Sequence, residues 1–155
     1  MKIEWKLSAF KELATDELYA ILKLRQKVFV VEQQCIYLDC DGLDIRAHHL
    51  VGWYNTGERL KPIAYLRVIY PEKSSNSISI GRFLTHPDYR GKGIAKEMMT
   101  RCLRSIEELY PKSSVCISAQ QYLTHFYETW GFSVSSDGYD EDGIAHIDMT
   151  RSPVA

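Results

Sequence analysis

Residues 90–95 read Arg-Gly-Lys-Gly-Ile-Ala, and they connect a strand pattern to a helix pattern. This stretch follows a strand pattern that ends at Thr85 and opens a helix pattern that ends before Pro111. Its two glycines let the backbone approach a ligand closely and expose consecutive N–H groups, while the start of the helix adds partial positive charge. Arg90 and Lys92 add two full positive charges. Together these features predict a cradle for a pyrophosphate group.

Two other phosphate loops are excluded by the spacing of the glycines. A Walker A loop needs Gly-x-x-x-x-Gly-Lys-Ser/Thr, and the chain has no such run. The dinucleotide fingerprint Gly-x-Gly-x-x-Gly needs a glycine near the position of Lys96. A glycine turn before a helix is also common for purely structural reasons, so residues 90–95 alone do not identify a ligand.

Hydrophobic periodicity outward from this stretch predicts strands and helices in mixed order. One helix begins at Thr15, where a capping hydroxyl precedes two acids, another follows Gly93, and a short aromatic-rich helix spans residues 121–130. A polar loop spans residues 32–47, and an acidic turn spans residues 137–143. The expected strands are residues 2–7, 49–54, 62–70, 77–85, 115–119, 132–136 and 144–150.

The order of these elements predicts a fold of the α/β (α+β) class, with a central mixed sheet of about seven strands flanked by helices. Turn chemistry at residues 55–58 and 71–76 makes the second to fourth strands an antiparallel meander. The strand–helix–strand unit over residues 77–119 should be a right-handed parallel crossover. Because no linker-like segment interrupts the chain, residues 1–155 are expected to form a single domain.

The composition excludes several classes of protein. Of 155 residues, 45% are hydrophobic, and 19 Lys+Arg against 20 Asp+Glu give a net charge of −1. This balance argues against non-specific electrostatic binding to nucleic acid or to an anionic membrane. No apolar run approaches the ~20 residues of a membrane helix, and the charged N-terminus lacks a signal-peptide pattern. We therefore expect a cytoplasmic protein with four reduced cysteines, Cys35, Cys40, Cys102 and Cys116.

A second motif, Gln120…Phe126-Tyr127…Gly131-Phe132, lies downstream of the first. An Arg-x-x-Gly-x-Ala helix start, a buried strand and then Phe-Tyr-x-x-x-Gly-Phe strongly resemble the GNAT superfamily of acetyl-CoA-dependent N-acyltransferases. The resemblance covers essentially the whole chain, and it implies the GNAT fold, in which acetyl-CoA binds where two parallel strands splay apart. Three further segments look like the ElaA-type branch of this superfamily: residues 25–33, 37–42 and 141–147.

The same resemblance implies residue roles around acetyl-CoA as the cosubstrate, with no metal. The segment Phe83, Leu84 and Thr85 matches the strand whose backbone pairs with the pantetheine arm. Gln120 stands where the family often has Asn beside the pantetheine amide, and it carries the same donor and acceptor groups. Tyr127 matches a tyrosine near the thioester sulfur. The pyrophosphate contacts match Arg90, Gly91, Lys92, Gly93, Ile94 and Ala95.

The implied reaction transfers an acetyl group from the CoA thioester to a primary amine by direct attack in a ternary complex. The phenol of Tyr127 can protonate the leaving thiolate as general acid, and a backbone N–H near Leu84 or Thr85 can stabilise the oxyanion. The general base is open, because the family often has a strand Glu where this chain has Gly81 and Arg82. The candidates are a water chain or one of Glu32, Asp39, Asp41, His48, His49 and His146.

Acidic residues gather in the loop that the resemblance places beside the acceptor. Glu32, Asp39, Asp41 and Asp44 would attract a cationic amine if they line the cleft, and residues 140–142 add three more acids. The acceptor would then be a polyamine, an aminoglycoside-like amine, or a lysine or N-terminal amine of a peptide. A solvated acidic loop is the simpler alternative. The expected substrate-binding residues are Glu32, Asp39, Asp41, His49 and His146.

Other functions compete with the enzyme. A non-catalytic acyl-CoA-binding sensor or regulatory module would keep the phosphate cradle without useful acid–base groups, and the missing strand Glu favours it. The spacing of Tyr127 favours the enzyme. A nucleic-acid binder has little support, because basic residues cluster only at the phosphate turn. Dimers are common in the superfamily, so a homodimer through the last strands or a free sheet edge is a further expectation.

Overall fold

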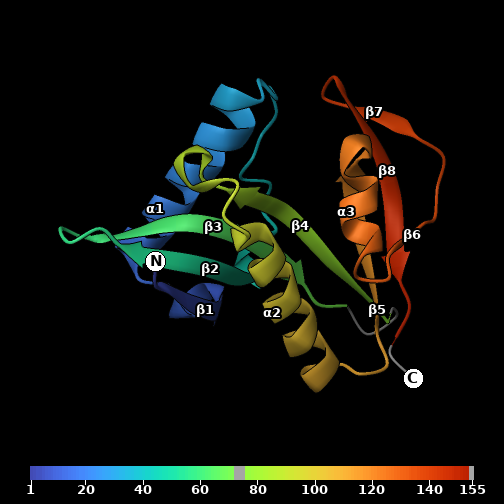
Figure 1. Ribbon diagram of the computed structural model, residues 1–155, viewed down its shortest axis with the longest axis horizontal. Helices are drawn as coiled ribbons and strands as arrows, with labels where there is room; N and C mark the ends of the chain where they lie inside the picture. The colour runs from blue at the N-terminus through green and yellow to red at the C-terminus, as the bar shows by residue number, and fades with distance from the viewer. Residues whose placement is uncertain (72–75, 154–155) are drawn as a thin grey trace.

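Within residues 1–71 and 76–153, which the computed structural model describes, eight strands form one mixed sheet (Figure 1). Their order is β1-β2-β3-β4-β5-β8-β6, and β7 pairs with β8 off this path. Strands β4 and β5 pair in parallel, and the other neighbouring pairs are antiparallel. The bounds are β1 Ile3–Ala9, β2 His48–Asn55, β3 Leu60–Ile69, β4 Ser77–Thr85, β5 Ser114–Gln120, β6 Ser133–Val134, β7 Tyr139–Glu141 and β8 Ile144–Arg151.

The α+β class, the antiparallel meander of β2, β3 and β4, and the parallel pairing of β4 with β5 confirm the predictions from the sequence. The eighth strand, β7, lies inside the segment 137–143 that was expected to be a turn. The strand expected at 132–136 shrinks to two residues, Ser133–Val134. Of the turn expected at 71–76, residues 72–75 lie outside the described residues.

The main helices begin where the sequence predicts, and only the third is shorter than expected. The helix that begins at Thr15 continues past Arg25 as a π-helical segment, which extends its apolar stripe to Phe29. The helix expected at 121–130 is a 3-10 turn followed by a short helix that ends at Glu128. The helical segments are 3-10 turns Phe10–Glu12, Asp44–Arg46, Pro87–Tyr89 and Gln121–Leu123, π-helix Gln26–Glu32, α1 Thr15–Arg25, α2 Ile94–Leu109 and α3 Thr124–Glu128.

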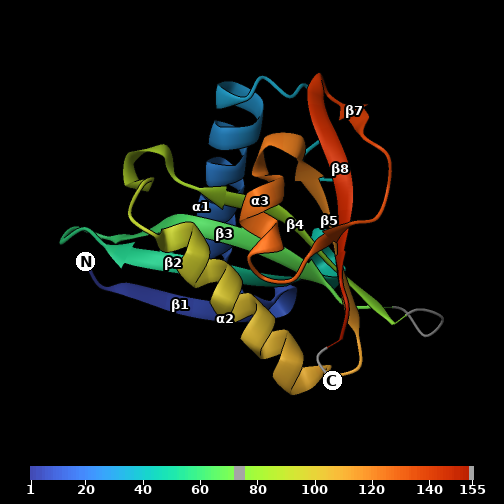
Figure 2. The ribbon, with the colours of Figure 1, turned by 45° about the vertical axis from the view of Figure 1, so that its right-hand side comes forward.

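Helices cover both faces of the sheet (Figures 1 and 2). Helices α2 and α3 contribute to one core, in which Met98, Met99 and Tyr127 are buried. Helix α1 and the π-helical segment bury a second core against the opposite face, where Ile21 and Val28 are buried with strand residues. None of the described helices is long and apolar enough to cross a membrane.

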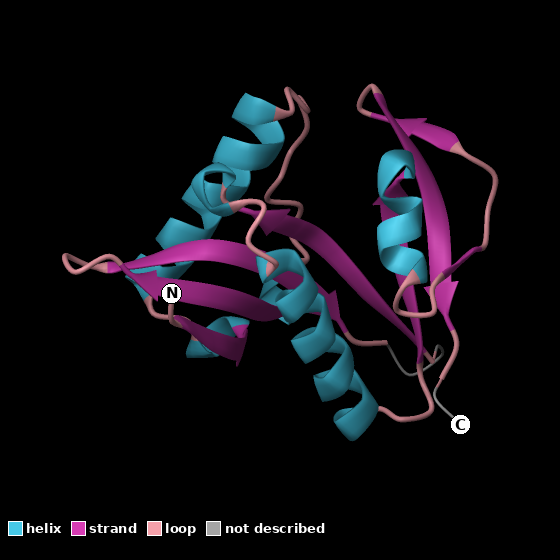
Figure 3. Ribbon diagram, viewed as in Figure 1, coloured by secondary structure: helices cyan, strands magenta, loops and turns pink. Residues whose placement is uncertain are grey.

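Strands β4 and β5 separate halfway along their length, and this separation opens the sheet (Figures 1 and 3). Their parallel pairing runs from Ser77 opposite Ser114 to Ile80 opposite Ile117, and it ends there. Beyond this point both strands continue, β4 to Thr85 and β5 to its end, without pairing to each other. The two unpaired edges therefore face a common gap in the sheet.

A β-bulge in β4 coincides with the point of separation. Arg67 of β3 pairs with Gly81, but Tyr65 pairs with Leu84, so two residues of β4 oppose a single residue of β3. Arg82 in the bulge has a left-handed backbone, with a φ of 52°. Because a bulge bends its strand and increases the local twist, it turns the last residues of β4 away from β5.

Candidate active site

A cleft of about 810 Å³ lies where β4 and β5 separate. Its lining comes from the ends of these strands, the turn before α2, helix α3, the chain after the π-helical segment, and the β7–β8 hairpin. Of the residues expected at the cofactor, every one but Lys92 lines the cleft. Of those expected at the acceptor, Asp41 and His146 line it, whereas Glu32, Asp39 and His49 do not.

The turn before α2 has the geometry of an anion cradle. Gly91 and Gly93 adopt left-handed backbone conformations, with φ of 78° and 77°. Helix α2 starts at Ile94, and no side chain caps its first turn, so the first N–H groups of the helix remain available to a ligand. A Cβ atom built on either glycine would meet nothing within 4 Å, so the space in front of the turn is open. This arrangement fits a pyrophosphate.

Arg90 and Glu32, which were expected to serve different ligands, contact each other. The guanidinium donates from Nη1 and Nη2 to the Glu32 carboxylate over 2.9 and 2.6 Å, and its Nε donates to the Thr85 carbonyl over 3.1 Å. These hydrogen bonds hold the pKa of Glu32 below its usual value. Both side chains are more than one-third exposed, so the pair is weak and a phosphate can compete for Arg90.

The backbone of β4 after the bulge supplies polar groups to the cleft. The N–H of His86 donates to the Ile63 carbonyl of β3 over 2.7 Å. Because backbone groups alternate in direction along a strand, those of Leu84 also face β3, while those of Phe83 and Thr85 face the opposite edge. The N–H groups of Phe83 and Thr85 are therefore the ones that can reach a ligand in the cleft. An oxyanion donor was expected near Leu84 or Thr85, and this geometry excludes the N–H of Leu84, which faces β3.

Gln120, at the end of β5, reaches across the cleft. Its Nε2 donates to Oε1 of Gln33 over 3.3 Å, and Gln33 follows directly after the π-helical segment. Both side chains line the cleft, so one hydrogen bond links its two sides. A bound pantetheine arm would find amide donors and acceptors from both directions here.

Tyr127 lines the cleft from α3 and is 6% exposed. Its ring packs edge-on against the rings of Phe83, Phe126 and Phe132. Among residues 1–71 and 76–153, no hydrogen bond to its hydroxyl is found. Burial raises the pKa of Tyr127 far above its ordinary value, and Tyr122 adds to this effect. The phenol therefore stays protonated at neutral pH, as a proton donor requires.

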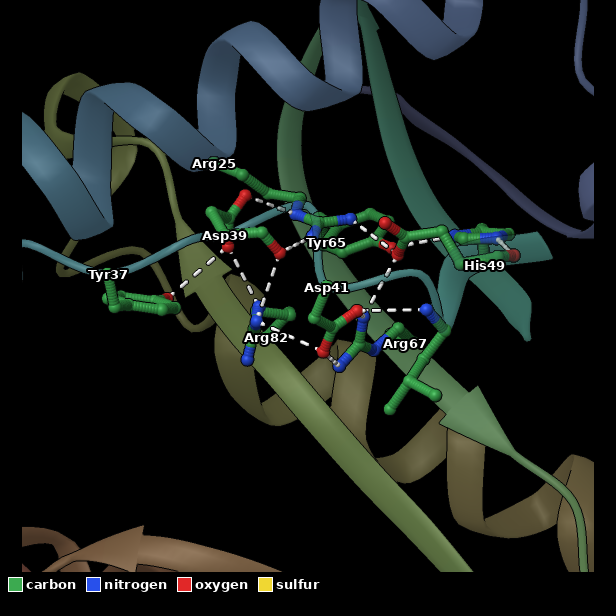
Figure 4. A network of polar contacts seen from close by, with 10 residues as sticks. Arg25, Tyr37, Asp39, Asp41, His49, Tyr65, Arg67 and Arg82 are labelled. Carbon is green, nitrogen blue, oxygen red and sulfur yellow. Dashed lines mark hydrogen bonds and ion pairs between the residues drawn. The ribbon is translucent and has the colours of Figure 1, made fainter. Parts of the chain in front are cut away.

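The acidic loop expected to face the acceptor is instead neutralised by three arginines from other elements (Figure 4). Arg25 of α1 is fully buried and donates to Asp39 over 2.9 Å and to Asp44 over 2.7 Å. The other ion pairs join Arg67 to Asp41 at 2.8 Å and to Asp44 at 3.0 Å, and Arg82 to Asp39 at 2.8 Å and to Asp41 at 3.3 Å. Three carboxylates meet three guanidinium groups, so this loop offers no excess negative charge.

Two histidines expected as candidates lie outside the cleft lining. His49 is 1% exposed, and its Nδ1 and Nε2 contact the Tyr65 hydroxyl at 2.6 Å and the Asp44 carbonyl at 3.0 Å (Figure 4). Burial lowers the pKa of His49, so its ring is neutral. His48 packs edge-on against Tyr70. The structure therefore brings neither ring into the cleft lining.

His146 lies in the cleft lining together with the acidic tip of the β7–β8 hairpin. Its Nδ1 is 2.7 Å from the Ile144 carbonyl, and its Nε2 is 3.4 Å from Oε2 of Glu141. Asp142 and Gly143 both have positive φ, 51° and 82°, which is the geometry of a two-residue type I′ turn. Glu141 and Asp142 line the cleft and form no ion pair with a Lys or Arg of the described residues.

Some lining residues were not assigned from the sequence. Gln33 and Cys35 lie in a segment that the resemblance covers without giving them a role, and Tyr122 follows Gln120 by two positions. The position of Tyr122, just after the strand that ends at Gln120, is the feature of the sequence that indicates a place in the cleft lining. Burial, followed by the charges of Asp142 and Glu141, raises the pKa of the Cys35 thiol, so Cys35 is a poor nucleophile. Residues 1–71 and 76–153 contain no group of three metal-ligating side chains.

Comparison with known proteins gives the same assignment as the geometry. A family description, "Acetyltransferase (GNAT) domain", matches residues 61–153. Protein ElaA of Escherichia coli is 36% identical over 154 residues, 98% of each chain, and UPF0039 protein sll0451 of Synechocystis is 40% identical over 149 residues, 96% of this chain and 95% of that protein.

Solved structures extend the match to three dimensions. An acyl-CoA N-acyltransferase from Pseudomonas aeruginosa has a TM-score of 0.90 and 37% identity, and it covers 97% of this chain and all of its own. The crystal structure of Escherichia coli ElaA has a TM-score of 0.89 and 35% identity, with the same coverage. The splayed strands, the glycine turn before α2 and these matches together show that the chain belongs to the GNAT acetyltransferase family and is an ElaA-like acyltransferase.

Proposed function

We propose that the protein transfers an acetyl group from acetyl-CoA to a primary amine by direct attack in a ternary complex. The observation that carries the proposal is one continuous cleft. It has an uncapped helix start beyond the glycine turn at one end and the unpaired hydroxyl of Tyr127 in its wall. A thioester supplies an acetyl group that is already activated. The protein therefore has to orient the thioester, accept a proton from the amine and donate a proton to the sulfur.

The phosphate turn and the unpaired strand edges would hold acetyl-CoA. The N–H groups at the start of α2, together with Gly91 and Gly93, would bind the pyrophosphate. The backbone groups of Thr85 and the side chain of Gln120 would pair with the pantetheine arm. This placement brings the thioester to the bulge of β4, next to the aromatic wall that contains Tyr127.

Two groups would act on the reacting thioester. The N–H of Phe83, which lies in the bulge and whose ring contacts Tyr127, would stabilise the negative charge that develops on the carbonyl oxygen. The hydroxyl of Tyr127 would protonate the sulfur as the carbon–sulfur bond breaks. An ordinary Tyr has a pKa near 10 and a thiol a pKa near 8.5, so this transfer is uphill and depends on a fixed distance between the two atoms. The packed ring of Tyr127 supplies that fixed position.

The charge pattern of the cleft supports a cationic amine as the acceptor. Asp39, Asp41 and Asp44 are neutralised by arginines, and Glu32 is paired with Arg90. Two lining carboxylates have no Lys or Arg partner among the described residues, those of Glu141 and Asp142 on the β7–β8 hairpin. The attraction for a cation therefore comes from the β7–β8 hairpin rather than from the loop at 32–47.

Replacing Gly93 with alanine is expected to weaken acetyl-CoA binding about tenfold or more. A Cβ at this position would occupy the open space in front of the turn, and a left-handed conformation costs an alanine ~1–2 kcal/mol. Titration calorimetry with acetyl-CoA measures the effect. Gly57→Ala is the matched control, because Gly57 has a φ of 94° and open space but lies in the β2–β3 turn. Equal affinities in the two variants would refute the cradle.

Asp142→Asn is expected to raise the KM for a diamine about three- to tenfold at low salt without lowering kcat, since it removes one charge from the acceptor side. Asparagine tolerates the left-handed backbone at this position, so the turn survives. The effect should shrink at high ionic strength. Asp137→Asn makes the same charge change outside the cleft lining and should leave KM unchanged. A KM that does not respond to Asp142→Asn would exclude the cationic site.

Mass spectrometry of a panel of amines incubated with the protein and acetyl-CoA tests the proposed function. We expect acetylation of at least one cationic amine, with release of one CoA for each acetyl group transferred. A non-catalytic acyl-CoA sensor is the competing function, favoured by the lack of a carboxylate on β4 between Gly81 and Thr85. A sensor would bind acetyl-CoA, yet transfer nothing to any amine in the panel.

A further inference from the structure

We infer that His146 is the general base that takes the proton of the attacking amine, with Glu141 stabilising the charged imidazolium. This inference rests on the proposed function and assigns the proton acceptor that β4 lacks. His146 is 8% exposed and lines the same cleft as Tyr127. In the sheet it lies directly opposite Gln120, so it sits beside the end of β5 where the two strands have separated.

The hydrogen bond of Nδ1 fixes the tautomer of His146. The Ile144 carbonyl, 2.7 Å away, can only accept, so Nδ1 carries a proton. In the neutral ring the other nitrogen, Nε2, then has a free lone pair, which is the group that a general base needs. The bond to Ile144 orients the ring, and a hydrogen bond of 3.2 Å from Nε2 of Gln121 to the His146 carbonyl ties the backbone of β8 to the residue after β5.

Glu141 is placed to stabilise the product of proton transfer. Its Oε2 is 3.4 Å from Nε2 of His146, so it would attract the imidazolium once the ring is charged. The type I′ turn fixes the hairpin that carries Glu141, and the Tyr139 ring stacks on His146 with centroids 6.1 Å apart. The Tyr139 hydroxyl is in turn anchored to Asp148 over 2.6 Å and to Ser118.

The other candidates for the base are already committed or lie elsewhere. Asp39 and Asp41 accept from arginines, which makes them poor proton acceptors. Glu32 does not line the cleft, and its carboxylate is paired with Arg90. His49 does not line the cleft either, and both of its ring nitrogens form hydrogen bonds. Among the side chains that the sequence analysis named as possible general bases, His146 is thus the one that combines an available lone pair with a place in the cleft lining.

His146 and Tyr127 together account for both proton transfers of the reaction. The amine nitrogen forms a bond to the thioester carbon, and Nε2 of His146 takes the proton that the nitrogen loses. The carbon–sulfur bond then breaks, and the sulfur takes the hydroxyl proton of Tyr127. Solvent afterwards removes the proton from the imidazolium and returns one to the tyrosinate. One acetyl-CoA and one neutral amine thus give one amide and one CoA thiol.

His146→Ala is expected to lower kcat about 10²- to 10⁴-fold and to leave acetyl-CoA affinity unchanged. Free imidazole should restore part of the lost rate, because it can enter the space that the side chain leaves and act as the base. His146→Asn keeps a donor for the Ile144 carbonyl but has no basic nitrogen, so it should be equally slow while it folds like the native protein.

A pH profile of kcat/KM separates a base from a purely structural histidine. An acid limb in the wild-type profile that is absent in His146→Ala is the expected result. The titratable groups around the ring are Tyr139 and Glu141 from β7, Asp142 from the turn, and Cys35 from across the cleft. None of these is altered by either variant.

The controls distinguish a failure of the proposed function from a failure of the role assigned to His146. His125→Ala changes a histidine of α3 that is 98% exposed, and it should leave kcat unchanged and show no response to imidazole. A wild-type protein that acetylates no amine would overturn the proposed function and the inference with it. An active wild type with a His146→Asn rate within a few-fold of its own would overturn the role of His146 alone.

Discussion

Tyr127→Phe is expected to lower kcat about 10²- to 10⁴-fold, the range that a general acid contributes, while acetyl-CoA affinity stays the same. The substitution removes only the hydroxyl, which forms no hydrogen bond within the described residues. The ring keeps its contacts with Phe83, Phe126 and Phe132, so the fold and the cofactor cleft should be unaffected. A loss of rate can then be attributed to the missing proton.

Steady-state kinetics with one amine and titration calorimetry with acetyl-CoA measure the two halves of this prediction. Tyr19→Phe is the matched control, because Tyr19 is 73% exposed on α1, away from the cleft lining, and its hydroxyl should not affect the rate. A Tyr127→Phe variant with a kcat within about twofold of the wild type would show that solvent protonates the thiolate. Solvent isotope effects on the wild-type rate would then locate the proton.

Arg25→Met is expected to lower the free energy of unfolding by about 3–5 kcal/mol, the cost of leaving a buried ion pair without one partner. Arg25 is fully buried, and its guanidinium makes hydrogen bonds to Asp39 and Asp44, including the Asp39 carbonyl. Methionine fills similar volume, so the cost comes from the uncompensated carboxylates rather than from a cavity. For a chain of this length the change corresponds to a fall in Tm of roughly 6–20 °C.

Urea unfolding of the native protein and of two variants measures this difference. Arg101→Met removes an ion pair with Glu97 whose side chains are 50% and 45% exposed, and it should cost less than about 1 kcal/mol. The network also holds the bulge of β4, since Arg82 donates to the Asp39 carboxylate and carbonyl. If Arg25→Met were no more destabilising than Arg101→Met, the network would not be what fixes the loop onto β4.

The phosphate turn could be predicted from the sequence because its causes are local. The left-handed conformations of Gly91 and Gly93 and the free N–H groups at Ile94 follow from residue type and position. The resemblance to GNAT proteins extended this local signal to Tyr127 and Gln120, and both lie in the cleft. Pattern and spacing thus selected residues that the fold brings together in one cleft, and their contacts with acetyl-CoA stay a prediction.

The acceptor side could not be predicted in the same way, because its charges are balanced by distant residues. Asp39 reads as a free acid in the loop, but its partners Arg25 and Arg82 lie 14 and 43 residues away in the chain. The spacing of residues in the sequence does not indicate ion pairs between residues so far apart in the chain. The bulge at Arg82 is equally hidden, because nothing local requires a left-handed arginine there.

The sequence contains a local signal for the β7–β8 hairpin. Asp142-Gly143 is a preferred dipeptide for a two-residue hairpin turn, and it predicts strands on both sides. Interpreting residues 137–143 as an acidic turn hid the strand that carries Glu141 next to His146. The unpaired carboxylates of the cleft were thus assigned only an auxiliary role from the sequence.

The shift in Tm on adding acetyl-CoA tests the central claim, that this cleft is an acyl-CoA site, most directly. At about 100 times its Kd, acetyl-CoA should add about 2.7 kcal/mol to the free energy of unfolding, which raises Tm by roughly 5–11 °C. ATP and NAD serve as controls and should produce much smaller shifts. No shift at millimolar acetyl-CoA would mean that the glycine turn has only a structural role, and both the transferase and the sensor would be excluded.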